Sequence, residues 1–96
     1  MEFRNLKIPP CTAKRLGGIV KSHKGTMSKS AILAAIITSA VTNVARGVAL
    51  PDPVEMEPGN FRQVNFRIDG ATYERFVNLC PFVNGRAVVG PVFAAL

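Results

Sequence analysis

The chain repeats itself at a spacing of sixty residues. When residues 4–36 are aligned without a gap with residues 64–96, seven of the 33 pairs are identical. The identical pairs are Asn5/Asn65, Ile8/Ile68, Thr12/Thr72, Arg15/Arg75, Gly25/Gly85, Ala34/Ala94 and Ala35/Ala95. Average residue usage would give about two, and many mismatches join similar residues, such as Leu6 with Phe66. Two copies are too few for a solenoid, so we expect them to pack on each other as one domain.

Size and charge narrow the class of protein. The chain has 96 residues, 48% of them hydrophobic, which is enough for one core but not for two independent ones. Its net charge is +6, and the first fifty residues hold eight Lys and Arg against Glu2 alone. The remaining residues hold four cations and five acids. The basic first half favours a polyanionic partner, and nucleic acid is the commonest of these.

Several function classes lack the residues that they need. The longest uncharged run lies between Lys29 and Arg46 and is too short and polar for a membrane span, and no export signal opens the chain. Cys11 and Cys80 are unrelated by the repeat and have no zinc-like spacing, which indicates two thiols in a reducing cytoplasm. His23 is the one histidine, on an apolar stripe where we expect it to pack partly buried. We therefore expect no enzyme, no metal and no cofactor.

The same elements are predicted in both copies. Alternating side chains predict short strands over residues 3–8 and 63–68. A helix follows each strand, begun by Pro9-Pro10 in the first copy and capped by Asp69 in the second, with Gly25 and Gly85 as the turns that end them. Ser28 is the expected N-cap of a long apolar helix to Arg46, and its shorter counterpart is expected to start at Pro91.

These elements divide the chain into three segments. Residues 1–46 form the first copy and residues 63–96 a second, shortened copy. Residues 47–62 between them are rich in Pro and acids, which predicts an extended linker. We expect the two copies to intertwine around one core.

The order strand, helix, glycine turn, helix resembles the ribbon-helix-helix family of DNA-binding proteins. In the second copy, Gln63-Val64-Asn65-Phe66-Arg67 is similar to the Gln-x-Asn-x-Arg strand of the Arc repressor type. Asn84-Gly85-Arg86 is similar to its Asn-Gly-Arg turn, one residue further along. The first copy resembles the more general pattern of a basic strand and a Gly-x-x-Ser helix start. The resemblance implies a mainly α fold with a two-stranded antiparallel ribbon, here as a tandem copy forming a single-chain pseudo-dimer.

The resemblance also implies a function and a site. The ribbon would enter the DNA major groove of a phage, plasmid or bacterial operator, most simply as a cytoplasmic, nucleoid-associated transcriptional repressor. Base contacts are expected from Asn5, Lys7, Gln63, Asn65 and Arg67, whose side chains match guanine or adenine edges. Phosphate contacts are expected from Thr26, Ser28, Lys29, Ser30 and Arg86. Because the copies differ, the preferred site should not be palindromic.

Two alternatives remain open at this point. A polar strand face can simply be a solvated sheet surface. The fold can also serve as an interaction module, a phage-encoded inhibitor or a plasmid relaxosome accessory, whose main partner is a protein. The apolar segment Val92 to Leu96 is expected to be exposed and favours this alternative, because an uncovered apolar end usually binds a partner or a second copy.

Overall fold

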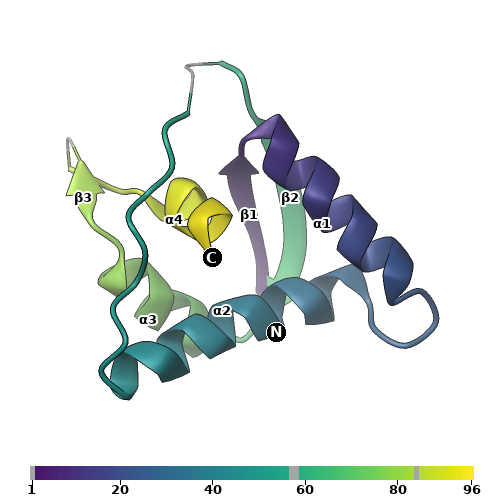
Figure 1. Ribbon diagram of the computed structural model, residues 1–96. Coiled ribbons are helices and arrows are strands. Elements are labelled where there is room, and N and C mark those ends of the chain that lie inside the picture. The colour runs from purple at the N-terminus through teal and green to yellow at the C-terminus, as the bar shows by residue number, and fades with distance from the viewer. Residues whose placement is uncertain (1, 57–58, 84) are drawn as a thin grey trace.

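A two-stranded antiparallel ribbon with helices packed on one face makes up most of the fold (Figure 1). The computed structural model describes residues 2–56, 59–83 and 85–96, and for residues 83 and 86 only the backbone. Within these residues the elements are β1 (Glu2–Ile8), α1 (Pro10–Ser22), α2 (Lys29–Ala45), β2 (Arg62–Ile68), α3 (Gly70–Leu79), β3 (Phe82–Val83), β4 (Arg86–Ala87) and α4 (Val89–Ala95).

The ribbon consists of β1 and β2, as the alternating side chains predicted. The inward-facing residues that are buried are Leu6, Ile8, Val64, Phe66 and Ile68. Residues of the opposite parity on both strands are exposed. A two-stranded sheet alone is unstable in water, so the ribbon depends on the helices that cover its buried face.

The pairing of the strands is symmetric about Asn5 and Asn65. These two residues lie opposite each other, with Phe3 opposite Arg67 on one side and Lys7 opposite Gln63 on the other. The sixty-residue shift that relates Asn5 to Asn65 also exchanges the two flanking pairs. The register is therefore the one that a twofold axis through the centre of the ribbon requires.

Each half of the chain packs a helix on the strand of the other half. The first-half helix α2 packs on β2 and α3, whereas α4 packs on β1 (Figure 1). The starts of these two helices touch the strands at positions related by the same shift. Ser30 Oγ accepts a hydrogen bond from the Arg67 amide at 3.0 Å, and Gly90 lies against the backbone of Lys7. The contacts at both helix starts fix the helices to the ribbon.

Local signals determine where the helices begin and end. The side chain of Ser28 accepts a hydrogen bond from the Ala31 amide at 3.1 Å, and Asp69 accepts one from the Thr72 amide at 3.1 Å. Both predicted N-caps are confirmed. The third helix ends at Leu79, two residues before Pro81, because proline cannot continue a helix.

A single core joins the ribbon to the helices. Its largest fully buried side chains are Phe66, Phe76, Ile8, Leu33, Ile37, Ile68 and Val92. Tyr73 packs its ring edge-on to Phe66 with 6.1 Å between the ring centroids. Because the strands, α2, α3 and α4 all contribute to this cluster, neither half has a core of its own.

Three local predictions were wrong. The last helix begins at Val89, two residues before Pro91, and a short β3–β4 hairpin surrounds Gly85 where a plain helix-ending turn was expected. Asn84 of that turn lies outside the described residues. His23 is exposed, because α1 ends at Ser22 and the histidine follows it rather than lying on its apolar stripe.

The prediction that the apolar C-terminal segment is exposed was also wrong. Val92, Phe93 and Ala94 are 0%, 4% and 5% exposed; within this segment Ala95 is half-buried and Leu96 is exposed. The reason is tertiary: α4 packs beneath β1 and fills the same core as α2 does beneath β2.

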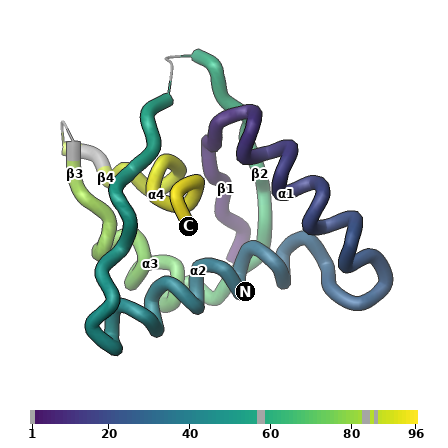
Figure 2. Tube along the Cα trace, viewed as in Figure 1, coloured from purple at the N-terminus to yellow at the C-terminus, as the bar shows by residue number. Residues whose placement is uncertain are grey.

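The segment between the copies crosses the molecule without helix or strand in its described part, residues 47–56 and 59–61 (Figure 2). The Val54 amide donates to the Pro91 carbonyl at 3.2 Å, and Leu50 packs on the core. Asp52 and Glu55 are exposed. The segment is thus attached to α4 through the Val54 backbone and carries Asp52 and Glu55 on the outside.

Candidate nucleic-acid interface

The exposed face of the ribbon, called here the outer face, consists of six side chains. These are Phe3, Asn5 and Lys7 from β1, with Gln63, Asn65 and Arg67 from β2. All six are exposed, and none is acidic. Five of them are the residues predicted to contact bases, and the structure brings these five together on one surface.

The outer face is ordered into three cross-strand pairs. Asn5 and Asn65 lie at the centre, with the amide of Gln63 3.5 Å from Asn65 Oδ1. Each end carries one cation, Lys7 on one strand and Arg67 on the other. The arrangement presents hydrogen-bonding amides between two positive charges, and such groups match the donor and acceptor edges of bases in the major groove.

Both cations of the outer face rest on aromatic rings. The Arg67 guanidinium carbon lies 4.5 Å from the centre of the Phe3 ring, and Lys7 Nζ lies 5.0 Å from the centre of the Phe61 ring. Such contacts hold long side chains in place and reduce the entropy that binding would remove. Phe61 was not among the residues predicted from the sequence, although its position two residues before Gln63, at the same parity, indicates it.

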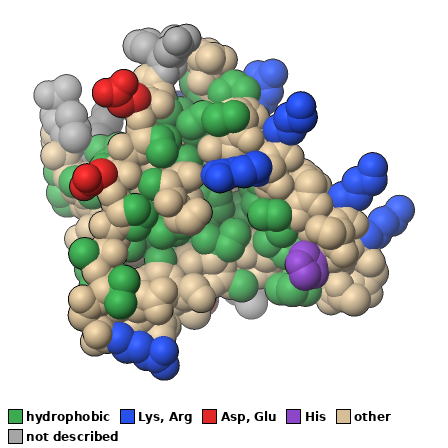
Figure 3. Space-filling model, viewed as in Figure 1, with side chains coloured by type: hydrophobic (Ala, Val, Ile, Leu, Met, Phe, Trp, Pro, Cys, Tyr) green, Lys and Arg blue, Asp and Glu red, His purple; other side chains and the backbone are tan. Residues whose placement is uncertain are grey.

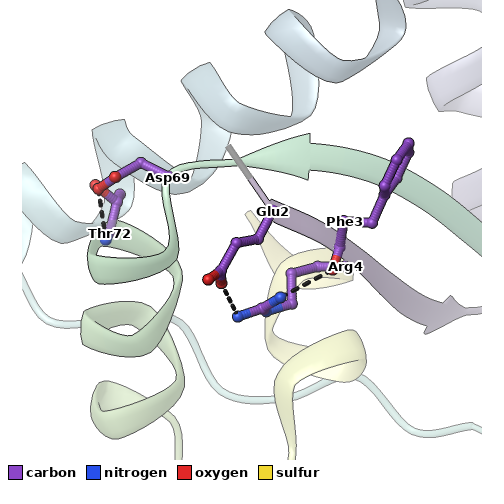
Figure 4. Close-up of polar contacts among 5 residues, drawn as sticks. All are labelled: Glu2, Phe3, Arg4, Asp69 and Thr72. Atoms are coloured by element: carbon purple, nitrogen blue, oxygen red, sulfur yellow. Dashed lines mark hydrogen bonds and ion pairs between the residues drawn. The ribbon is translucent and has the colours of Figure 1, made fainter.

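Glu2, the acid of β1, lies on the side of the strand opposite to the outer face. Figure 4 shows the side chains of Glu2 and Arg4 on the side of β1 away from the Phe3 ring, where they form an ion pair. The Arg4 guanidinium also lies 5.4 Å from the centre of the Tyr73 ring. The ion pair neutralises Glu2 beside α3, so its charge does not oppose an anion at the outer face.

The start of α2 is the second part of the candidate interface. Ser30 is fixed to the Arg67 amide, and this bond places the first turn of α2 at the end of the ribbon that carries Arg67. Lys29 is exposed there. A helix N-terminus next to an exposed lysine favours an anion, because its free N–H groups and dipole add to the lysine charge.

The predicted phosphate-contacting residues are not equally available. Thr26 Oγ1 donates its proton to the His23 carbonyl at 2.8 Å, whereas the hydroxyl oxygens of Ser28 and Ser30 accept hydrogen bonds from backbone amides and keep their O–H groups for a phosphate oxygen. Lys29 is the strongest of these candidates, because among the described side chains of the set it is the one that carries a positive charge, and it is exposed. The side chain of Arg86 lies outside the described part of the structure.

The start of α4, related to that of α2 by the repeat, has different chemistry. Val88 precedes it without a side-chain cap, and Gly90 stands where α2 has Ser30. Val89 occupies the position that corresponds to Lys29, so the positive charge of Lys29 has no equivalent there. The two ends of the ribbon are thus chemically unequal.

Positive charge extends beyond the ribbon. Lys and Arg side chains follow α1 and its connection to α2 along one side of the molecule, while acids lie over the segment between the copies (Figure 3). The described residues contain no group of three or more His, Cys, Asp or Glu that could hold a metal ion. Within the same residues, no helix is long and apolar enough to cross a membrane.

The shifted titrations in this structure have local causes. Hydrogen bonds from the Thr72 amide and hydroxyl lower the pKa of Asp69, as expected for an N-cap carboxylate. Burial raises the pKa of Cys80 to about 11 and raises that of Tyr73. Each of these three groups serves a cap or a packed core rather than an acid–base pair.

Comparisons with known proteins give no relative from which the role of the outer face could be inferred. No protein-family model matches the chain, and comparisons with curated proteins and with solved structures likewise give no match.

Proposed function

We propose that this protein binds double-stranded DNA by inserting the β1–β2 ribbon into the major groove, and that it acts mainly as a transcriptional repressor by occupying an operator. The observation that carries the proposal is the outer face: five hydrogen-bonding side chains, no acid, and a cation at each end. A two-stranded ribbon has the width that the major groove accepts. The basic first half of the chain would add attraction for phosphate.

We further infer that the chain is a ribbon-helix-helix pseudo-dimer. The symmetric register about Asn5 and Asn65 supports this inference, as does the exchange in which α2 packs on β2 and α4 on β1. In a dimer of two chains, both halves of the ribbon would be identical. Here the sequences differ, so the two half-sites would differ as well.

The size of the expected site follows from the ribbon. From Phe3 to Lys7 the strand advances four residues of about 3.3 Å each, about 13 Å, which spans about four base-pair steps of 3.4 Å. Asn5 and Asn65 suit adenine, while Arg67 suits guanine. We therefore expect a short, non-palindromic core with A·T pairs at its centre and a guanine toward the Phe3–Arg67 end.

Selection of bound duplexes from a random pool, followed by binding at several salt concentrations, tests the proposal. Arg67→Ala should relax base choice at one position, because a bidentate arginine–guanine pair is worth about 1–3 kcal/mol of discrimination. A pool that yields no enriched sequence, together with a steep dependence on salt, would leave only general polyanion affinity. An unchanged site for Arg67→Ala would remove the role given to that residue.

The role of the α2 start is tested by two matched charge removals. Lys29→Ala should weaken binding to all sequences and reduce the salt slope by up to about one unit. Arg46→Ala removes the same charge at the other end of α2, about 26 Å away along the helix. Equal effects of the two variants would mean that only net charge matters there.

A second candidate function is protein binding. A hollow of about 160 Å³ is lined by Thr12, Arg15, Leu16, Ile19, Ile36, Phe93 and Leu96, between α1 and α4. Ile19 and Leu96 are 42% and 40% exposed there, beside the cation Arg15. An apolar hollow with a cation at its edge fits an amphipathic helix that has acidic residues beside its apolar stripe.

A fluorescent helical peptide with a leucine face and a glutamate face would test this second function. Binding that Ile19→Lys weakens, in a chain that light scattering shows to be monomeric at every concentration, would support it. No binding of the peptide would argue against it, and scattering that rises with concentration would indicate self-association instead.

A further inference from the structure

Phe3 is the one apolar side chain among the six of the outer face. Its exposure to water costs free energy, because apolar surface is more stable when buried. Phe3 is 65% exposed, the same fraction as Phe82 of β3. No other large hydrophobic residue of β1 or β2 is as exposed. The repeat places a hydrogen-bonding residue, Gln63, at the equivalent position of the other strand. The substitution makes the two ends of the ribbon chemically different.

The neighbourhood of Phe3 restricts what its ring can do. Arg67 lies directly opposite on the partner strand, and its guanidinium covers part of the ring at 4.5 Å. Figure 4 shows the ring on the side of β1 opposite to Glu2 and Arg4. The ring is therefore outside the core, next to a cation that also faces outward.

The major groove offers one apolar group to such a ring. Among the groups that bases present there, the C5-methyl of thymine alone is apolar, and contact with it is a known use of phenylalanine. We propose that Phe3 reads a thymine C5-methyl group next to the guanine contacted by Arg67. The proposal rests on the DNA-binding function proposed above, and it adds a specificity-determining residue that the hydrogen-bonding pattern does not supply.

The contact between Phe3 and Arg67 makes the two readings neighbours. Side chains that touch across the ribbon can reach adjacent base pairs but not distant ones. The expected site therefore contains a T·A pair beside a G·C pair at one end only. Lys7 and Gln63, at the other end, would read no methyl group.

Replacement of thymine by uracil isolates this contact, because uracil keeps every hydrogen-bonding group and lacks only the methyl. In the duplex selected by the wild-type chain, each thymine is replaced in turn by deoxyuridine, and dissociation constants are measured. One thymine, next to the guanine that depends on Arg67, should show about fourfold weaker binding as deoxyuridine, since one buried carbon is worth about that factor.

Three variants distinguish this reading from a general packing effect. Phe3→Ala should bind the thymine and deoxyuridine duplexes equally at that position, and Phe3→Gln should do the same. Phe61→Ala, which removes the half-buried ring beside Lys7 on the same face, should keep the fourfold ratio. Circular dichroism melting of all three variants verifies that they fold.

The outcomes distinguish failure of the thymine contact from failure of DNA binding. An enriched site without any methyl-dependent thymine, or a ratio that persists in Phe3→Ala, overturns this inference and leaves DNA binding intact. A random pool without an enriched sequence overturns both.

Discussion

Gly90 should be a position where a single added methyl group destabilises the fold. A Cβ on Gly90 would overlap the carbonyl oxygen of Lys7 and lie 3.0 Å from its carbonyl carbon. Contact between such atoms is comfortable only near 3.5 Å, so α4 would have to move away from β1 by more than about 1 Å. Because α4 carries Val92 and Phe93 into the core, that movement would loosen the packing beneath β1.

The expected cost of Gly90→Ala is about 1–3 kcal/mol, the usual range for overpacked sites. For a domain of this length, 1 kcal/mol corresponds to about 4–8 °C in Tm, so a loss of 2 kcal/mol lowers Tm by about 8–16 °C. Thermal unfolding followed by circular dichroism at 222 nm measures it.

Gly18→Ala is the matched control. Gly18 lies inside α1, and a Cβ there would meet nothing within 4 Å. The same substitution should therefore stabilise the fold by about 0.4–1 kcal/mol, because alanine loses less backbone entropy in a helix than glycine. A Tm for Gly90→Ala at or above that of the wild type would refute the close packing of α4 on β1.

Two further predictions concern titratable groups. Asp69→Asn keeps a capping side chain but removes its charge. The pKa of Asp69 in the folded chain is lowered from 3.8, so the charged form stabilises the fold above pH 3.8. This stabilisation is lost as the pH falls through the folded pKa. The wild type should thus be the more stable protein at pH 7, with a Tm difference that shrinks at pH 3, and a difference independent of pH would contradict the cap. At pH 8, a thiol reagent followed by mass spectrometry should modify exposed Cys11 much faster than Cys80, which is buried with a pKa raised to about 11. Equal rates at the two cysteines would show that the core around Cys80 opens easily.

The features that sequence alone predicted are those set by neighbours within about four residues. Alternation of Leu6 and Ile8 with polar residues indicated a strand, because side chains of a strand point to opposite faces in turn. Ser28 and Asp69 were identified as caps because each hydrogen bond joins residues only three apart. For the same reason, the sequence alone predicted that the five proposed base-reading residues lie on the exposed face of their strands.

Tertiary structure decided everything that depends on distant segments. The sixty-residue repeat suggested that the copies pack together, but only the folded chain brings Asn5 opposite Asn65 and exchanges α2 and α4 between the strands. The burial of Val92 and Phe93 was predicted wrongly, because an apolar run has no local signal that distinguishes a covered surface from a free one. Periodicity and capping act within one element, whereas register and burial are settled by the free energy of the whole core, to which both halves contribute.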